Sequence, residues 1–333
     1  MKKSVLLLAM AAGMAQAADV ELKIATWLPP SHSVNSVLLP KLVEELEKRT
    51  EGRVTAKVEY DLAAPNGLLE LVEYGGADIS WTYNGYFPGR FITTKLIELP
   101  GYEGNSSAAA VAHWRAHEKY LKDANEYEGV ELIGFMVHGP AFLFMKNEID
   151  GLKAVEGRKM RAGGGVANDV AAALKTSPIL APASKSYEMI TGGMADGTML
   201  PADVIPSFRL YEAAPHAYTL PGGFYRGSFA LFMNENALDK VSEADQKAIR
   251  EYFGEALSRD AGAVWDIDYD KGLVLQKEKG TIAELPADDL AKMAEVSKEI
   301  REKVIKEIND KGVDGQAAYE LVVETFASEM KGK

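Results

Sequence analysis

The stretch from residue 21 to residue 83 alternates between strand-like and helix-like patterns, and this alternation constrains the fold more than any other feature of the chain. Alternating apolar and polar residues predict strands at 21–27, 54–60 and 78–83. Apolar residues at helical spacing predict helices at 38–50 and 68–74 between them. Strands and helices in this order are typical of a parallel sheet covered by helices, so we predict an α/β fold.

A second strand–helix series follows His138-Gly139-Pro140, which we interpret as a crossing point between two lobes. Before it, we predict a helix at 108–122 and a strand at 130–137. After it come predicted strands at 142–145, 158–161 and 178–180 and helices at 169–174 and 187–194. A strand at 228–234 is expected to return to the first lobe. No flexible linker separates the two series, so several chain segments should cross between the lobes.

The last third of the chain is helical. Ser242 and Asp245 form a capping box, and the buried stripe that follows reaches about Leu275 without a proline. We therefore predict one long helix that braces both lobes. Two further helices are expected at 290–308 and after Asp314.

Residues 1–17 have the pattern of a signal peptide. Lys2 and Lys3 form the basic start, residues 5–10 the apolar segment, and 15–17 the small-residue cleavage site. Cleavage after about Ala17 would change the net charge from −12 to −14, with 35 basic residues left against 49 acidic ones. No later stretch is long and apolar enough to span a bilayer. We expect an exported, periplasmic protein that is not itself membrane-spanning.

The chain has no cysteine and a clear acidic excess. Export without disulfides fits the bacterial periplasm and a fold with a sufficient core. The missing thiol excludes a cysteine nucleophile and thiolate metal ligands. The acidic balance argues against nucleic acid as a partner, because phosphate binding needs clustered lysine and arginine.

Arg161 is the first candidate for a binding residue. It lies at the end of a predicted strand and is followed by three glycines at 163–165, where the bare backbone lets a ligand come close. Such an arginine can hold a carboxylate with two parallel hydrogen bonds, although a solvated ion pair is the ordinary role of a single arginine. The glycines could also cradle a phosphate, but they lack the ending of a P-loop and the spacing of a dinucleotide site.

The histidines are the next candidates. His32 and His138 lie in loops after strands, where α/β folds place ligands. His113 and His117 have the spacing of two metal ligands on a helix, but the glutamate of a zinc peptidase is absent. We interpret this pair as ordinary helix-surface histidines and predict no metal and no cofactor.

Aromatic residues gather at strand ends, beside glycine and asparagine. They are Trp27, Trp81, Tyr83, Tyr86 and Phe224. Such residues usually belong to the core, but in this placement they could instead wall a pocket for the apolar body of a ligand.

Four segments, in the right order, resemble the extracytoplasmic solute-binding proteins of tripartite ATP-independent periplasmic (TRAP) transporters, the DctP-type family. They are a helix that ends in Thr-Glu-Gly-Arg at 50–53, a helix–glycine–strand segment at 71–79, the Gly-Arg-Lys-Met-Arg segment at 157–161, and the segment 184–197 that ends in Ala-Asp-Gly. The resemblance extends over nearly the whole chain after the N-terminal segment.

The resemblance implies a periplasmic-binding-protein-like fold of two α/β lobes with a hinge and a long bracing helix. Lobe I would comprise residues 18–138 plus about 226–265, and lobe II residues 139–225 plus about 266–333. The lobes would close over a small organic acid, and the closed protein would deliver that acid to a TRAP membrane permease without any reaction.

The resemblance also implies that Arg161 anchors the substrate carboxylate. A second arginine that some members carry falls near Ala141 here, and a polar residue before Pro201 is here Leu200. A sugar acid would therefore leave hydroxyls unpaired, at about 1–3 kcal/mol each. We predict a small, mostly apolar monocarboxylate, an aromatic one included. The residues expected at the site are Arg161, Trp27, His32, Trp81, Tyr83, Tyr86, His138, Gly163, Leu200 and Phe224.

Two alternatives stay open at this point. An exported hydrolase or lyase would use a cleft histidine, although His32 and His138 have no evident partner in the sequence. A binding protein of an ATP-driven importer would have similar lobes but no long helix that contacts both of them.

Overall fold

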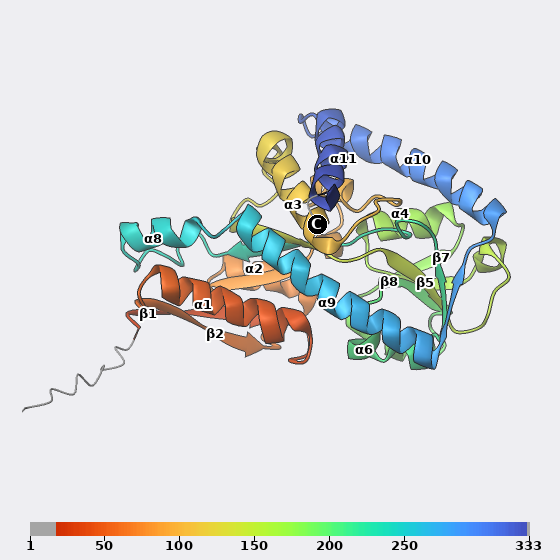
Figure 1. The fold of residues 1–333 in the computed structure, drawn as a ribbon, viewed down its shortest axis with the longest axis horizontal. Helices are drawn as coiled ribbons and strands as arrows, with labels where there is room; N and C mark the ends of the chain where they lie inside the picture. The colour runs from red at the N-terminus through yellow and green to blue at the C-terminus, as the bar shows by residue number, and fades with distance from the viewer. Residues whose placement is uncertain (1–17, 332–333) are drawn as a thin grey trace, which may run out of the picture.

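The computed structural model describes residues 18–331, and it has two α/β lobes, each built on its own β-sheet (Figure 1). The predicted signal peptide lies outside the described residues. Among residues 18–331, no helix combines the length and the apolar character that a membrane span requires.

The sheet of the first lobe has the strand order β2-β1-β3-β10-β4. Its strands are β1 (Val20–Thr26), β2 (Val54–Tyr60), β3 (Ile79–Tyr83), β4 (Glu131–Val137) and β10 (Ser228–Met233). β1 pairs in parallel with β2 and β3, whereas β10 lies antiparallel between β3 and β4. Every residue of β3 and β10 is buried, as expected for the interior strands of a covered sheet.

The sheet of the second lobe has the order β11-β9-β5-β8-β6-β7. Its strands are β5 (Ala141–Met145), β6 (Lys159–Ala162), β7 (Ser177–Leu180), β8 (Gly197–Pro201), β9 (His216–Thr219) and β11 (Thr281–Glu284). β6 pairs in parallel with β7 and β8, so their carboxyl ends lie at one edge of the sheet, where ligands bind in open α/β sheets.

Helices cover both sheets and connect the lobes (Figure 1). They are α1 (Leu39–Arg49), α2 (Leu68–Glu73), α3 (Ser106–Ala116), α4 (Gly165–Ala173), α5 (Ser186–Thr191), α6 (Val204–Phe208), α7 (Leu210–Ala213), α8 (Glu243–Arg250), α9 (Glu255–Lys279), α10 (Ala287–Asn309) and α11 (Gly315–Lys331). In α1, Leu39, Leu42 and Leu46 form the buried face, which matches the helical spacing in the sequence.

α9 is the long helix that braces both lobes. It runs obliquely across the front of the molecule in Figure 1. It packs against α3 and β4 on the side of the first sheet and against α6, α7 and β11 on the side of the second sheet. The predicted brace is thus confirmed, and the lobes are also joined by the chain between β4 and β5 and between β9 and β10.

The expectation of one unbroken helix from Ser242 to about Leu275 is wrong. The Ser242 hydroxyl caps α8 as predicted, since it accepts a hydrogen bond of 3.2 Å from the Asp245 backbone N–H. The helix is interrupted before α9 at Gly254, whose φ of 80° lies in the left-handed region. A Cβ at this position would lie 2.6 Å from the Trp114 ring, so this close contact with α3 requires glycine.

The interpretation of His113 as a surface residue is also wrong. His113 is 1% exposed, and its ring centre lies 3.8 Å from that of Phe135. Burial holds the pKa of His113 well below its usual range and lowers that of His117 to about 4. His113 is therefore a neutral core residue, whereas His117 is half-buried. Spacing along the chain does not reveal the burial of His113, because α3 is buried on nearly all sides.

The lobe boundaries stay a prediction. β10 belongs to the first sheet and β11 to the second. The two C-terminal helices differ in their contacts, because α10 packs against α4 whereas α11 packs against α3. The expected assignment of all residues after about 266 to lobe II therefore rests on the resemblance alone.

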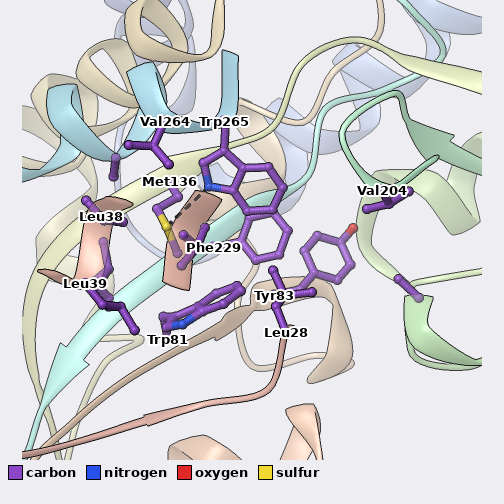
Figure 2. Packing of buried hydrophobic residues seen from close by; sticks show 14 of the residues in the cluster. Leu28, Leu38, Leu39, Trp81, Tyr83, Met136, Val204, Phe229, Val264 and Trp265 are labelled. Carbon is purple, nitrogen blue, oxygen red and sulfur yellow. Dashed lines mark hydrogen bonds between the residues drawn. The ribbon is translucent and has the colours of Figure 1, made fainter. Parts of the chain in front are cut away.

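One apolar core runs through the junction of the two lobes. Trp81 and Phe229 extend from the first sheet, and Trp265 covers them from α9 (Figure 2). The rings of Phe229 and Trp265 stack with centres 4.8 Å apart, and the indole N–H of Trp265 donates to the Met136 sulfur at 3.3 Å. This aromatic layer forms a rigid wall at the place where the two lobes meet.

Candidate ligand-binding site

Arg161 is buried at the junction of the lobes, and within the part of the chain that the structure describes it has no acidic partner. It lies on β6, next to the sheet edge where β6 and β8 end, and it is 1% exposed. Its Nε and Nη2 donate to one acceptor, the Ala181 carbonyl, at 2.8 and 2.6 Å. Nη1 has no partner among the described residues. A buried cation with a free donor is costly unless an anion joins it.

Arg226 is a second fully buried arginine, and it shows the opposite arrangement. It donates to the backbone carbonyls of Tyr102, Gly104 and His138. Burial lowers the pKa of Arg226 to about 10. Because these carbonyls accept from its N–H groups, Arg226 stabilises the segments that cross between the lobes. Arg161, by contrast, retains one N–H donor for another group.

A small cavity of about 30 Å³ lies beside Arg161 in this closed structure. It is lined by Tyr83, Tyr86, His138, Arg161, Gly163, Ala183, Leu200, Pro201, Val204, Tyr225, Phe229 and Trp265. These residues come from both sheets, from α9 and from the chain crossings. Aromatic and aliphatic side chains with one guanidinium are a typical setting for a ligand with an apolar body and one acidic group.

Two tyrosines of the first lobe hold the cavity closed. The Tyr83 hydroxyl donates to the Gly164 carbonyl at 3.1 Å, and the Tyr86 hydroxyl accepts from the Ala183 backbone N–H at 2.9 Å. Burial raises the pKa of Tyr86, and the nearby Arg161 guanidinium acts in the opposite direction. The structure therefore represents a closed conformation, with Tyr86 beside the guanidinium.

The triple glycine allows the lobes to approach each other closely. Gly164 has a φ of 94°, and a Cβ on it would overlap the carbonyl of Gly85 in the first lobe. A Cβ on Gly163 would lie 2.9 Å from the Tyr83 ring. Here the glycines make room for backbone and an aromatic ring of the opposite lobe.

Glu98 forms another contact across the junction. Its carboxylate accepts from the Val166 backbone N–H in the first turn of α4 at 3.0 Å and from the Ser228 hydroxyl at 2.8 Å. Burial raises the pKa of Glu98 to about 7. The carboxylate thus joins a helix end of the second lobe to a strand of the first lobe.

His138 lines the cavity but is already engaged. Its Nε2 accepts from the Gly227 backbone N–H at 2.8 Å, and its Nδ1 lies 2.6 Å from the Gly139 carbonyl, so the proton belongs on Nδ1. Burial lowers the pKa of His138 to about 3. A histidine held in this way fixes the two chain crossings and is a poor general base near neutral pH.

His32 lies behind the cavity wall. Its ring meets that of Trp265 edge to face at 5.2 Å. Its Nδ1 accepts from the Val34 backbone N–H at 3.2 Å, and its Nε2 lies 3.9 Å from the carboxylate of Asp203. His32 therefore packs on Trp265 of the cavity wall and lies near the carboxylate of Asp203. It does not line the cavity itself.

The structure brings together six of the ten residues expected at the site. Tyr83, Tyr86, His138, Arg161, Gly163 and Leu200 line the cavity. The other four do not: Trp27 and Trp81 lie in or against the core behind it, His32 packs on Trp265, and Phe224 belongs to a separate apolar cluster. Ala141 is also buried in that second cluster.

Several lining residues were not expected from the sequence. Tyr225 adjoins the predicted Phe224, and Phe229 lies opposite Tyr83 in the β3–β10 pairing, so alternation along β10 would have placed it on the same face. Trp265 and Val204 reach the cavity only through tertiary packing. Among residues 18–331, no group of three or more acidic or histidine side chains is arranged to hold a metal ion.

Comparisons with known proteins agree with this architecture. Residues 24–307 match the family model DctP, described as bacterial extracellular solute-binding protein, family 7. A structure of a TRAP periplasmic solute-binding protein from Bordetella bronchiseptica, with bound (R)- and (S)-mandelate, has a TM-score of 0.89 and 33% identity, and the match covers 92% of this chain and 99% of that one.

Two further proteins are similar over nearly their whole length. A marine metagenome TRAP solute-binding protein specific for aromatic acids, in complex with metahydroxyphenylacetate, has a TM-score of 0.84 and 25% identity, with 93% of this chain and 99% of that chain covered. A Comamonas testosteroni protein named outer membrane transporter protein TsaT is 27% identical over 310 residues, which cover 92% of this chain and 91% of that protein. The chain therefore belongs to the DctP family, whose members are periplasmic TRAP solute-binding receptors and not enzymes.

Proposed function

We propose that this receptor captures a small monocarboxylate with an apolar, aromatic body and delivers it to a TRAP membrane permease. The observation that carries the proposal is the buried guanidinium of Arg161, which has a free Nη1 beside a cavity walled by aromatic rings. A carboxylate placed there would pair with the cation, and the rings would cover the body of the acid.

The polarity of the cavity favours this ligand class. Leu200 presents an aliphatic side chain to the cavity, so a polyhydroxylated acid would find no partner at that position. The relatives bound to mandelate and to metahydroxyphenylacetate are consistent with an aromatic acid in this chain too.

Capture would work by a shift between open and closed conformations. A ligand carboxylate favours the closed form because it pairs with Arg161 only when the cleft has closed over it. Burial of the apolar body adds about 25 cal/mol per Å² before the cost of ordering. The closed surface, made of both lobes, would then dock on the permease.

A thermal-shift screen of matched acids tests the proposal. At a concentration of 100 times Kd, a ligand stabilises the protein by about 2.7 kcal/mol, which should raise the Tm of a chain of this length by roughly 4 °C. We expect such shifts with benzoate, phenylacetate and mandelate. Benzamide serves as the control, because it keeps the ring and lacks the charge. The largest shift with a sugar acid such as gulonate, or equal shifts with benzoate and benzamide, would contradict the proposal.

A further inference from the structure

Three tyrosines line the cavity, and one of them keeps its hydroxyl proton free. Tyr83 and Tyr225 each donate this proton to a backbone carbonyl, at 3.1 and 3.3 Å. The Tyr86 hydroxyl instead accepts from the Ala183 backbone N–H at 2.9 Å, and among residues 18–331 its own proton has no acceptor. A phenol is both a donor and an acceptor, so Tyr86 retains one hydrogen bond for another group.

Tyr86 and Arg161 come from opposite lobes but meet at one short segment. Tyr86 ends the turn Asn84–Tyr86 after β3 of the first lobe, whereas Arg161 lies on β6 of the second. The Ala183 N–H that binds Tyr86 and the Ala181 carbonyl that binds the guanidinium are two residues apart. Both side chains line the same small cavity. The free hydroxyl proton and the free Nη1 therefore lie at the same end of this cavity.

Tyr86 also forms the partition between the cavity and the mouth of the cleft. A second pocket, of about 120 Å³, lies between the lobes and is bordered by the exposed Pro88 and Leu180. Tyr86 and Gly163 are the two residues that line both pockets. An acid group bound at Arg161 is thus closed off from the mouth by Tyr86, the ring that carries the free hydroxyl proton.

We propose that the Tyr86 hydroxyl donates a hydrogen bond to the carboxylate that Arg161 binds, so that both lobes hold one carboxylate. The inference rests on the proposed function, in which Arg161 anchors the acid. A carboxylate has acceptor sites on both oxygens, so it can accept from Nη1 and from the phenol together. The Ala183 N–H makes the phenol a stronger donor, because hydrogen bonds in a chain polarise one another.

This contact gives the acid group a direct part in closure. Arg161 belongs to the second lobe and can meet the carboxylate in the open form, whereas Tyr86 reaches it only when the first lobe has closed. A ligand shifts the equilibrium by its differential contacts in the two forms. The hydrogen bond from Tyr86 is such a contact, and every acid that binds at Arg161 makes it whatever its apolar body.

Removal of single hydroxyls, measured by isothermal titration calorimetry, tests the inference. Tyr86→Phe keeps the ring, and it should weaken the binding of benzoate and of phenylacetate by the same factor, because the two acids share only the carboxylate and the ring. Tyr83→Phe is the matched control, since it also removes one tyrosine bond between the lobes but no proposed ligand contact. We expect Tyr86→Phe to bind benzoate at least about tenfold less tightly than Tyr83→Phe.

Infrared difference spectroscopy adds a readout that a purely structural role would not change. Benzoate with ¹³C in its carboxylate, at saturating concentration, gives a stretching band that reports the hydrogen bonds of its oxygens. This band should shift between the wild type and Tyr86→Phe, and it should stay in place in Tyr83→Phe. Melting curves of the empty variants show that both are folded.

The outcomes distinguish this inference from the proposed function. No binding of any aromatic acid to the wild type would refute the proposed function itself. Affinity of Tyr86→Phe for benzoate equal to that of Tyr83→Phe, or an unshifted carboxylate band, would overturn the role of Tyr86 and leave that of Arg161 intact. A loss confined to one of the two acids would show that Tyr86 packs against the body of the acid, and it would also overturn the inference.

Discussion

Replacing Arg161 by methionine should remove ligand binding without destabilising the empty protein. In the closed structure, Nε and Nη2 share the Ala181 carbonyl, and Nη1 has no partner. The substitution leaves that carbonyl unsatisfied, at about 1–3 kcal/mol, but it also removes a buried cation whose desolvation costs several kcal/mol. These effects oppose each other, so the Tm should stay within a few degrees of the wild type or rise.

The loss of affinity should be much larger than any change in stability. A hydrogen bond between charged groups contributes about 1.5–3 kcal/mol, and a ligand carboxylate left unpaired in the closed cavity costs about 3–5 kcal/mol. Since 1.4 kcal/mol corresponds to a factor of ten, the affinity for benzoate should fall by more than about 100-fold. Isothermal titration calorimetry of wild type and Arg161→Met, with melting curves of both empty proteins, measures the two effects.

Arg226→Met is the matched control, because it removes the other fully buried arginine in the same way. There the side chain satisfies three backbone carbonyls, so the substitution should lower the Tm through lost hydrogen bonds. Wild-type affinity for benzoate in Arg161→Met would refute the anchor role. A fall in Tm as large as that of Arg226→Met would refute the claim that Arg161 is poorly satisfied in the empty protein.

Two predictions concern stability. Burial raises the pKa of Glu98 from 4.5 to about 7, so the native state holds this proton more tightly than the unfolded state. The resulting stabilisation is complete below pH 4.5, and about 3 kcal/mol of it is lost as the pH rises to about 7. Urea unfolding of Glu98→Gln should show a weaker decline over this range, and parallel curves would contradict the assignment. Gly254→Ala should cost about 1–3 kcal/mol more than Gly52→Ala, because the two glycines share a φ near 80° but only Gly254 faces the Trp114 ring. Equal Tm losses in the two variants would show that the contact is unimportant.

The local parts of the fold could be predicted from the sequence. Strands expected at 21–27, 54–60 and 78–83 appear as Val20–Thr26, Val54–Tyr60 and Ile79–Tyr83, because alternation reports directly which face of a strand is buried. The break at Gly254 could not be predicted, because an isolated glycine within a helical pattern is often tolerated and its contact with Trp114 is set by tertiary packing. β9 and β11 were missed because each has four residues and is defined mainly by its pairing with distant strands.

The same distinction holds for the candidate site: residues in local sequence motifs could be predicted, and residues brought there by tertiary packing could not. Arg161 and its glycines form a short motif that the sequence displays, and Tyr83 and Tyr86 lie close to a strand end. Trp265 reaches the cavity from a helix whose apolar stripe looks like ordinary core, and helix position alone cannot tell a core face from a cavity wall.

The incompletely hydrogen-bonded guanidinium at this site explains why closure should depend on the ligand. In the closed structure, Arg161 is buried, and its Nη1 has no partner among residues 18–331. Closing an empty cleft therefore removes a charged group from solvent at a cost that the cross-lobe bonds of Tyr83, Tyr86 and Glu98 must offset. A ligand carboxylate that pairs with Arg161 removes this penalty. Since a shift from 1:99 to 99:1 needs about 5.5 kcal/mol of differential binding, the carboxylate pair has to act together with burial of the apolar body to convert an open receptor into a closed one.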